Sequence, residues 1–398
     1  MIKNFSSIIA LSFFVVGLLT ACTVNQQKVI PSPTGGTSIK TITPTNQPTF
    51  TEEIFSTSTV TPSPFPTIEP THLPTPTVVE QIQATGHLIF TTRDDAWGEN
   101  IYMVDAACIG KFNACNSNWV QLTNIPWNPK ASYLNGCGWD QITASPDGKL
   151  LAFAYRTPEE ATKHCDEGWD IYKINIGECI GITNGCGPEN FTRLTDDKDA
   201  DTNPAWSPDG KRIAFISNRG PYVINASKLY MMNTDGSEQK LLLPEFYAGQ
   251  PYTLDWSPDG NSIVFSADNI PEVPYRPGLV IFSAELSNST VNQLTTLPKY
   301  EHRNPLDSFP QWSLDGQHIL FISNRGVGET DLFIMNPDGS DITRYTRLNT
   351  WMTGAQWSPD GKDIAFSTMR SISMVTKKDG VEIPIITGIN IGLFIWIP

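Results

Sequence analysis

The sequence is short of the residues and motifs that most enzymes use for catalysis. It holds five histidines in 398 residues, and it contains no Gly-x-Ser-x-Gly nucleophile elbow, no His-Glu-x-x-His helix and no phosphate-binding glycine loop. Basic residues are also scarce, with 27 Lys and Arg against 41 Asp and Glu and a net charge of −14. Because binding to nucleic-acid phosphates requires clustered basic side chains, we expect no nucleic-acid partner. We also expect no catalysis, no metal and no cofactor.

Long hydrophobic runs are absent except near the N-terminus. Residues 5–19 form an apolar stretch that is too short to remain as a membrane span, and it follows Lys3 and ends in Leu-Thr-Ala-Cys. This arrangement resembles the bacterial lipobox. It predicts that residues 1–22 are a lipoprotein signal peptide and that Cys22 carries the lipid. The alternative is an ordinary secretory signal in which the Cys is a coincidence.

Residues 23–80 lack the apolar content of a folded domain. Pro and Thr supply 25 of these 58 residues. Proline has no amide donor and threonine buries little surface, so no core is expected. We predict a disordered stalk between the membrane and the globular part. The protein would then be exported, anchored to the cell membrane only by its lipid, and would face the periplasm or the outside.

A four-residue turn recurs through the rest of the chain. Ser-Pro-Asp-Gly occupies residues 145–148, 207–210, 257–260 and 358–361, and Ser-Leu-Asp-Gly occupies residues 313–316. Proline presets the first turn dihedral and glycine accepts a left-handed backbone, so each copy predicts a tight hairpin. The copies are spaced by 62, 50, 56 and 45 residues, an interval typical of propellers.

Aromatic residues keep a fixed position relative to each turn. A Phe lies five residues after the turn glycine in every copy, and a Trp precedes four of the turns. Aromatics in the same register of repeated strands are expected to pack between sheets. These residues are Phe153, Phe215, Phe265, Phe321, Phe366, Trp206, Trp256, Trp312 and Trp357, and Phe90 fits the same frame without a turn.

Two further strands follow in most copies, such as "DIYKINI" and "FTRLTDD", which makes four strands per repeat. The C-terminal "LFIWIP" reads as a first strand without a blade, and "GHLIFTTR" at residues 86–93 reads as a second strand without a first. Together these ends complete one blade. The sequence therefore predicts an all-β fold over residues 81–398, a six-bladed β-propeller with four antiparallel strands per blade. Closure removes exposed sheet edges, and we expect a monomer.

The repeat resembles that of the TolB-type propellers over residues 86–398. The resemblance rests on Pro-x-Trp-Ser-Pro-Asp-Gly-Lys-x-Ile-Ala-Phe-x-Ser-x-Arg-Gly at residues 204–220 and Leu-Tyr-x-Met-Asn-x-Asp-Gly at residues 229–236. It implies the propeller fold. It does not imply one function, because this repeat serves periplasmic scaffolds, peptidase gating domains and other exported proteins.

Six cysteines besides Cys22 lie between residues 108 and 186. In an exported protein an even set indicates disulfides. The segments "CIGKFNAC" and "CIGITNGC" are near copies at the same place in adjacent repeats, so we expect Cys108–Cys115 and Cys179–Cys186. Cys137 and Cys165 then remain as a third pair. A zinc site is the alternative, although Cys-x-x-Cys spacing and histidine partners are missing.

A partner is expected on the face that carries the connections between blades. We predict that this face includes Trp139, His164, Asp201, Tyr252, His302, Asp307 and Trp351. The alternative is that these side chains only pack their loops. The acidic residues 196–201 could also bind calcium. The leading hypothesis is a non-catalytic module that binds a protein, peptide or glycan at the cell envelope. The alternatives are an exported lyase or glycan hydrolase that uses the axial funnel, and a structural envelope protein without a ligand.

Overall fold

The computed structural model describes part of the unit Gln81–Pro398. The described residues are 84–94, 98–109, 111, 114–116, 118–125, 142–157, 159, 168–219, 227–244, 246, 249–269, 278–296, 306–325, 329–376 and 382–398. Cys22, Cys137, Trp139, His164, Cys165 and His302 lie outside them.

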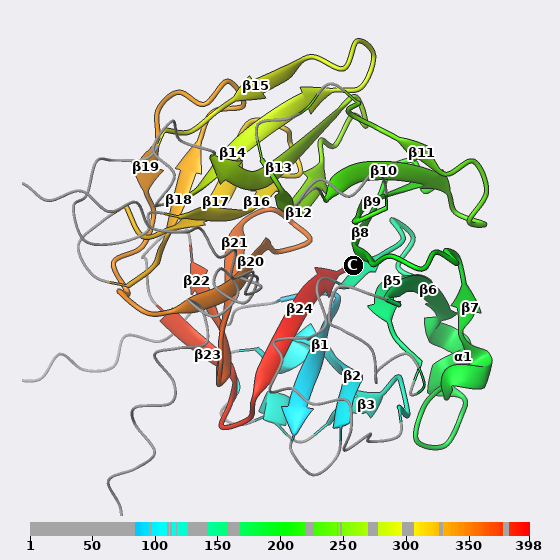
Figure 1. The fold of residues 1–398 in the computed structure, drawn as a ribbon. Helices are drawn as coiled ribbons and strands as arrows, with labels where there is room; N and C mark the ends of the chain where they lie inside the picture. The colour runs from blue at the N-terminus through cyan, green and yellow to red at the C-terminus, as the bar shows by residue number, and fades with distance from the viewer. Residues whose placement is uncertain are drawn as a thin grey trace, which may run out of the picture. The chain divides into compact units, whose positions relative to one another are not determined.

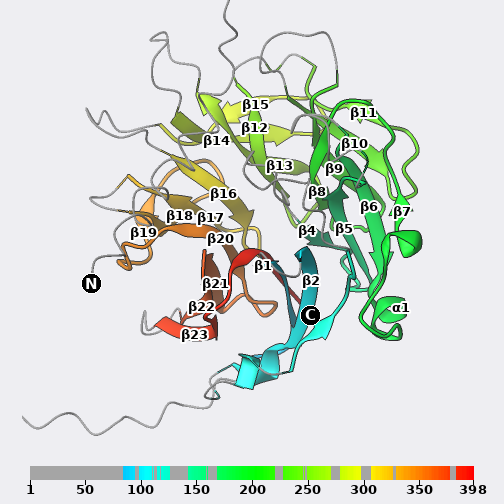
Figure 2. The ribbon, with the colours of Figure 1, turned by 60° about the horizontal axis from the view of Figure 1, so that its bottom comes forward.

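Six four-stranded antiparallel sheets, the blades, surround a central axis (Figures 1 and 2). Blade 1 contains β24 (Ile391–Ile397), β1 (His87–Asp94), β2 (Gly98–Asp105) and β3 (Val120–Gln121). Blade 2 contains β4 (Ile142–Ala144), β5 (Leu150–Tyr155), β6 (Asp170–Asn175) and β7 (Thr192–Arg193). Blade 3 contains β8 (Asp201–Trp206), β9 (Arg212–Ser217), β10 (Lys228–Asn233) and β11 (Lys240–Leu241).

The remaining blades repeat this order. Blade 4 contains β12 (Pro251–Trp256), β13 (Ser262–Asn269), β14 (Gly278–Glu285) and β15 (Val291–Gln293). Blade 5 contains β16 (Asp307–Trp312), β17 (Ile319–Ser323), β18 (Asp331–Met335) and β19 (Thr343–Arg344). Blade 6 contains β20 (Met352–Trp357), β21 (Asp363–Thr368), β22 (Ser371–Thr376) and β23 (Glu382–Thr387). The predicted six-bladed propeller is confirmed.

The two ends of the propeller pair in blade 1. β24 is antiparallel to β1, with His87 opposite Ile397, Leu88 opposite Trp396 and Phe90 opposite Phe394. The Trp396 indole donates a hydrogen bond of 3.0 Å to the carbonyl of Thr85. The predicted closure by the C-terminal strand is therefore confirmed. Since no covalent bond links β24 to β1, the ring depends on this pairing.

The aromatic register fills the core as predicted. All six phased phenylalanines are fully buried, namely Phe90, Phe153, Phe215, Phe265, Phe321 and Phe366. Each lies on the second strand of its blade, which is hydrogen-bonded to a neighbouring strand on both sides. Trp206, Trp256 and Trp357 are buried, whereas Trp312 keeps partial exposure. Truncating a buried Phe would remove about 3–5 kcal/mol of stability, so these positions determine the packing of the blades.

The recurring turns form a hydrogen-bonded unit. In Ser145–Gly148 the Ser145 hydroxyl donates to Asp147 Oδ1 at 2.6 Å and accepts from the Leu150 amide at 3.0 Å. The Gly148 amide donates to the Ser145 carbonyl at 2.8 Å, and Gly148 has a φ of 67°. The Lys149 amide also donates to Asp147 Oδ1, at 3.2 Å, and the hydrogen bonds from Ser145 and Lys149 lower the pKa of Asp147 to about 2. The serine, aspartate and glycine are thus explained by the turn itself.

Each turn also contacts its neighbour in the ring. A Cβ on Gly210 would lie 3.7 Å from Pro146 Cδ, and one on Gly260 would lie 3.3 Å from Pro208 Cγ. In blade 5 Leu314 takes the place of the proline and still reaches within 3.9 Å of the corresponding point on Gly361. We call the side of the ring that carries these turns the turn face, and the opposite side the loop face.

Among the described residues, short helices lie in or directly beside the two cysteine loops. These helices are the 3-10 helices Ala106–Cys108 (η3), Ala114–Asn116 (η4) and Pro188–Asn190 (η7), and the α-helix Ile176–Ile180 (α1). The disulfides Cys108–Cys115 and Cys179–Cys186 are both present, as predicted. The pairing of Cys137 with Cys165 stays a prediction. Within the described ranges, no helix has the length and hydropathy to cross a membrane.

Two glycines provide a matched test of ring closure. Gly86 and Gly388 have φ values of 88° and 83°, but a Cβ on Gly86 would lie 2.0 Å from the Ile397 carbonyl, whereas one on Gly388 meets nothing within 4 Å. Both alanine variants carry the left-handed cost of about 1 kcal/mol. We expect Gly86→Ala to lower Tm by at least about 4 °C more than Gly388→Ala, since only Gly86→Ala displaces β24. Equal Tm values in a calorimetric scan would contradict this role of the closing strand.

Candidate functional site

The inner strands carry irregular backbone around the axis. The register to the neighbouring strand shifts within β8, β12, β16 and β20, and between β1 and β24. Asn203 and Phe309 have φ values of 52° and 51°, and each precedes a proline. Positive φ is an outlier for a residue as bulky as Phe309. Since bulges re-aim side chains and occur often beside binding sites, this ring of bulges marks the axis as the candidate site.

A cavity of about 40 Å³ lies inside this ring. Five of the six inner strands line it, through Ile142, Thr253, Leu254, Phe309, Pro310, Gln311, Gly354, Ala355, Gln356, Leu393, Phe394 and Ile395. None of these residues is charged or a histidine. The cavity therefore offers aliphatic and aromatic contacts together with amide and hydroxyl groups. By volume it can hold about one to three water molecules.

Polar side chains of the inner strands link neighbouring blades. Gln356 Oε1 accepts from the Trp396 amide at 3.0 Å, and Thr143 Oγ1 accepts from the Trp206 amide at 3.4 Å. In blade 4 the same role falls to Asp255, whose Oδ2 accepts from the Trp312 amide at 2.9 Å. Burial raises the pKa of Asp255 to about 7. A neutral side chain would make the same bond without the cost of burying a charge.

Two of the predicted face residues are buried inside the blades. Asp201 and Asp307 form ion pairs with Arg219 and Arg325 and are fully buried. The Ser323 hydroxyl also donates to Asp307 Oδ1 at 2.6 Å. Asp201 and Asp307 are therefore wrong as residues of an accessible binding surface. Each stands eighteen residues before its arginine, and both arginines belong to the repeated "SNRG" segment, so the carboxylate neutralises a partly buried arginine.

Tyr252 and Trp351 are better placed at the loop face. Tyr252 is partly exposed near the start of β12, and its hydroxyl donates to Asp268 Oδ2 at 3.1 Å. Burial and the Asp268 carboxylate raise the pKa of Tyr252, and burial also raises the pKa of Asp268. Trp351 is partly exposed directly before β20. Trp139, His164 and His302 lie outside the described residues and remain predictions.

The acidic run at residues 196–201 forms ion pairs. Asp196 Oδ1 lies 2.9 Å from an Arg193 nitrogen, and Asp197 Oδ2 lies 3.7 Å from Arg219 Nε. Where the chain is described, no group of His, Cys, Asp and Glu has an arrangement that could hold a metal ion. The run thus neutralises arginines at the boundary between blades 2 and 3.

A second series of polar pairs was missed from the sequence. Asp170 pairs with Arg193 in blade 2 and Asp331 pairs with Arg344 in blade 5. In blade 1 Asn100 and Gln121 take these places, with Asn100 Oδ1 accepting from Thr123 and Gln121 donating to the Thr123 carbonyl. The signal was visible, because "DIY" accompanies "TRLT" whereas "NIY" accompanies "VQLT". Between blades 2 and 1, the aspartate and the arginine of the pair are thus both replaced by amide side chains.

Comparisons with known proteins identify the fold. The dipeptidyl peptidase IV N-terminal region matches residues 145–277. The chain is 25% identical to dipeptidyl-peptidase 5 of Porphyromonas gingivalis over 283 residues, which is 61% of this chain and 38% of that protein. It is 28% identical to the Tol-Pal system protein TolB of Francisella tularensis subsp. mediasiatica over 241 residues, which is 49% of this chain and 52% of that protein.

The solved structure of TolB from Acinetobacter baumannii superimposes with a TM-score of 0.55 at 16% identity, over 79% of this chain and 67% of that chain. The chain therefore forms a TolB-like six-bladed β-propeller, as its repeat predicted. Its matched part spans between about a third and a half of the curated relatives named above.

The raised pKa of Asp255 predicts a pH-dependent effect of its replacement. Folded Asp255 keeps its proton up to about pH 7, whereas the unfolded side chain releases it near 3.8, so its presence costs stability as pH rises between these values. We expect Asp255→Asn to raise the free energy of unfolding at pH 8 by on the order of 2 kcal/mol and to change it little at pH 4. Urea unfolding at both pH values measures this. A destabilised variant at pH 8 would show that the carboxylate is needed ionised.

The amide pair of blade 1 supplies the control for the ion pair of blade 5. Arg344→Gln leaves the buried Asp331 without its cation and should cost about 2–3 kcal/mol. Adding Asp331→Asn rebuilds the arrangement of Asn100 and Gln121, and we expect it to restore most of that loss. Denaturant midpoints of the two single variants and the double variant form the cycle. Additive losses would rule out the proposed equivalence of the two pairs.

Proposed function

We propose that this protein is an exported, lipid-anchored propeller that binds a protein or peptide partner on its loop face without catalysing a reaction. The observation that carries the proposal is the chemistry of the axial cavity. Its lining is uncharged, and Thr253 and Gln356 use their polar atoms to join blades. Hydrolysis and elimination require acid and base side chains at the reacting bond, and this lining contains none. It leaves apolar contacts and amide hydrogen bonds, which are the interactions that bind a protein or peptide.

The buried carboxylates support the same proposal. Asp201 and Asp307 are held by Arg219 and Arg325, so they are not available to a substrate. Arg219 also makes cation–π contacts, since its guanidinium carbon lies 5.5 Å from the ring centroid of Phe215 and 5.2 Å from that of Tyr230. A carboxylate with this role stabilises the blade. It is a scaffold group, and the chemistry left for a partner is contact and hydrogen bonding.

Chain direction indicates which face is available. His87 starts β1 opposite Ile397, near the end of the closing strand, so the chain enters the propeller on the turn face. The loop face, with Tyr252 and Trp351, lies at the opposite end of the strands from this entry point. The likeness to TolB, a Tol-Pal system protein, is consistent with a partner at the envelope.

An enzyme remains the second candidate, because two of the curated relatives are peptidases. Besides dipeptidyl-peptidase 5, the uncharacterized peptidase YuxL of Bacillus subtilis is 32% identical over 124 residues, 30% of this chain and 16% of that protein. In this reading the propeller would guide a peptide or glycan to chemistry at its axial funnel. Cleavage of peptides or polysaccharides by the purified full chain would favour it.

Site-directed photocrosslinking in cells tests the binding proposal. We place benzoylphenylalanine at Trp351 or Tyr252 on the loop face and, as the matched control, at the exposed Lys211 beside a turn. We expect a defined protein adduct from the two loop-face positions only. Gln311→Glu should lower its yield about tenfold, because it introduces a charge into the cavity lining.

Two outcomes distinguish the binding proposal from its alternatives. Adducts that form at Lys211 and not at the loop face would contradict the assignment of faces, and cleavage activity without an adduct would support the enzyme. Membrane fractionation of Cys22→Ser, which cannot form a thioether, tests the anchor in the same cells. We expect the variant in the soluble fraction, and a variant that stays with the membrane would rule out the lipid at this residue.

A further inference from the structure

The two disulfide loops lie on either side of the one blade that is built from both chain ends. Blade 1 takes β24 from the C-terminus and β1, β2 and β3 from the N-terminus of the propeller. The strands β1–β3 form a consecutive unit whose connection to blade 2 runs from residue 122 to residue 141. This unit is therefore held in the ring by β24 and by its contacts with blades 6 and 2.

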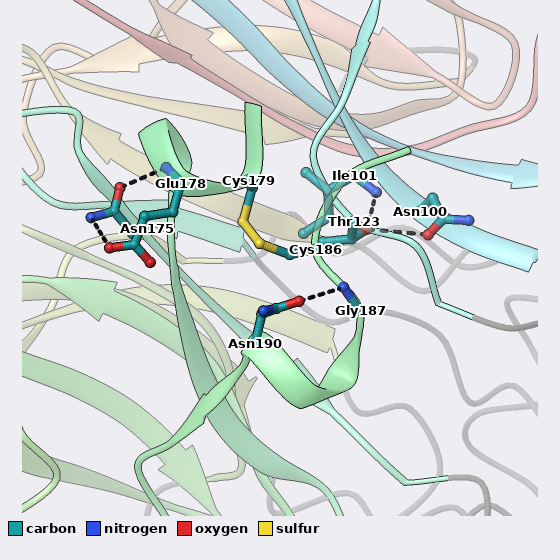
Figure 3. Close-up of a disulfide and its surroundings, with 9 residues drawn as sticks. All are labelled: Asn100, Ile101, Thr123, Asn175, Glu178, Cys179, Cys186, Gly187 and Asn190. Carbon is teal, nitrogen blue, oxygen red and sulfur yellow. Dashed lines mark hydrogen bonds between the residues drawn. A yellow bond between two sulfur atoms is a disulfide. The ribbon is translucent and has the colours of Figure 1, made fainter. Parts of the chain in front are cut away.

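The loop closed by Cys179 and Cys186 belongs to blade 2 and is bound to blade 1. The Cys186 amide donates to the Leu122 carbonyl at 2.9 Å, and the Asn124 amide donates to the Cys186 carbonyl at 2.7 Å. Thr123 and Cys186 thereby form a parallel bridge just beyond β3. Gly185 is packed so tightly that a Cβ would lie 2.7 Å from the Leu122 carbonyl carbon. Figure 3 shows Cys186 next to Thr123, which in turn holds Asn100 of β2.

The loop closed by Cys108 and Cys115 belongs to blade 1 and is bound to blade 6. Asn116 Oδ1 accepts from the amide of Thr387, the last residue of β23, at 3.3 Å. Cys115 is buried in one cluster with Ile385 and Ile386 of β23. Because this loop joins β2 to β3, it links the N-terminal strands of blade 1 to β23, the last strand of blade 6.

At other boundaries the same contact is made without a cysteine loop. In blade 3 Gly236 packs on the Leu194 carbonyl of blade 2, and in blade 5 Gly339 packs on the Leu294 carbonyl of blade 4. A Cβ added to either glycine would lie 2.5 Å from that carbonyl oxygen. There the backbone that joins the two blades is continuous over seven residues between β7 and β8, and over thirteen between β15 and β16. The boundary of blade 6 with β1 has no such continuous backbone, since β24 and β1 are only hydrogen-bonded.

We propose that the two disulfides are clamps that hold the N-terminal strands β1–β3 in the ring, and that their main effect is to suppress local opening between β1 and β24. A disulfide restricts the loop to conformations near the one that contacts the neighbouring blade. With both loops restricted, β1–β3 are held on their two flanks. Without them, the unit keeps its pairing with β24 and its core packing against blades 2 and 6, but loses the two restricted loop contacts. Opening between β1 and β24 would also disturb Leu393, Phe394 and Ile395, which line the axial cavity.

Native-state hydrogen exchange on the full chain tests the clamps. We compare three variants with the unchanged protein. One double variant combines Cys108→Ala and Cys115→Ala, the other combines Cys179→Ala and Cys186→Ala, and the fourfold variant carries all four substitutions. In the fourfold variant we expect exchange in peptides covering residues 87–92 and 391–397 to be at least about tenfold faster, while β13 and β17 of blades 4 and 5 exchange as in the unchanged protein. Uniform acceleration through all blades, or no acceleration at blade 1, would overturn the proposal.

A cross-link at the closing strands provides the rescue. Thr92 and Ile391 are opposite each other in β1 and β24, so Thr92→Cys with Ile391→Cys joins the two strands directly. Added to the fourfold variant, this pair should return the exchange of residues 87–92 to its original rate, and a failure to do so would show that the loops act elsewhere. If the alanine variants do not fold, the intact protein is compared before and after reduction with dithiothreitol, where two electrons and two protons convert each disulfide to two thiols. The same local pattern is then expected.

Discussion

The pairing of β24 with β1 is the interaction on which the rest of the molecule depends. Five blades are formed from consecutive strands, and only blade 1 needs residues separated by about three hundred positions. Its inner strand also supplies Leu393, Phe394 and Ile395 to the axial cavity. β24 therefore both closes the ring and lines the candidate site. The most non-local pairing of the fold uses the strand Ile391–Ile397, and three residues of that strand line the site.

The recurring turn contributes to the ring as well as to each blade. Within one turn, the conformation itself explains the serine, aspartate and glycine, since the hydroxyl, the carboxylate and the left-handed glycine form one hydrogen-bonded unit. The proline has a second role that no single repeat reveals. Pro146 faces Gly210 of the next turn and Pro208 faces Gly260, so the turns make a continuous row. Leu314 preserves the row by volume, and not by its dihedral preference.

Repetition explains why the fold could be predicted and the site could not. Blade number, closure and the six buried phenylalanines follow from periodic features, and the near identity of two eight-residue segments was enough to pair four cysteines. The candidate surface has no such support. Asp201 and Asp307 begin inner strands as predicted, but whether a carboxylate faces a ligand or an arginine depends on a partner eighteen residues away. The bulges at Asn203 and Phe309 were not predicted either, because a change of register depends on the pairing strand.

The direction in which the chain enters the ring has a mechanical consequence. If the protein is tethered through its N-terminus and held by a partner on the loop face, tension passes along β1 from His87 toward Asp94. The hydrogen bonds of an antiparallel pair run perpendicular to the strands, so this load falls on the bonds of β1 to β2 and to β24 together, in shear. Peeling, which would break them one at a time, requires force from the side. The pairing that closes the ring therefore also resists a pull applied along β1.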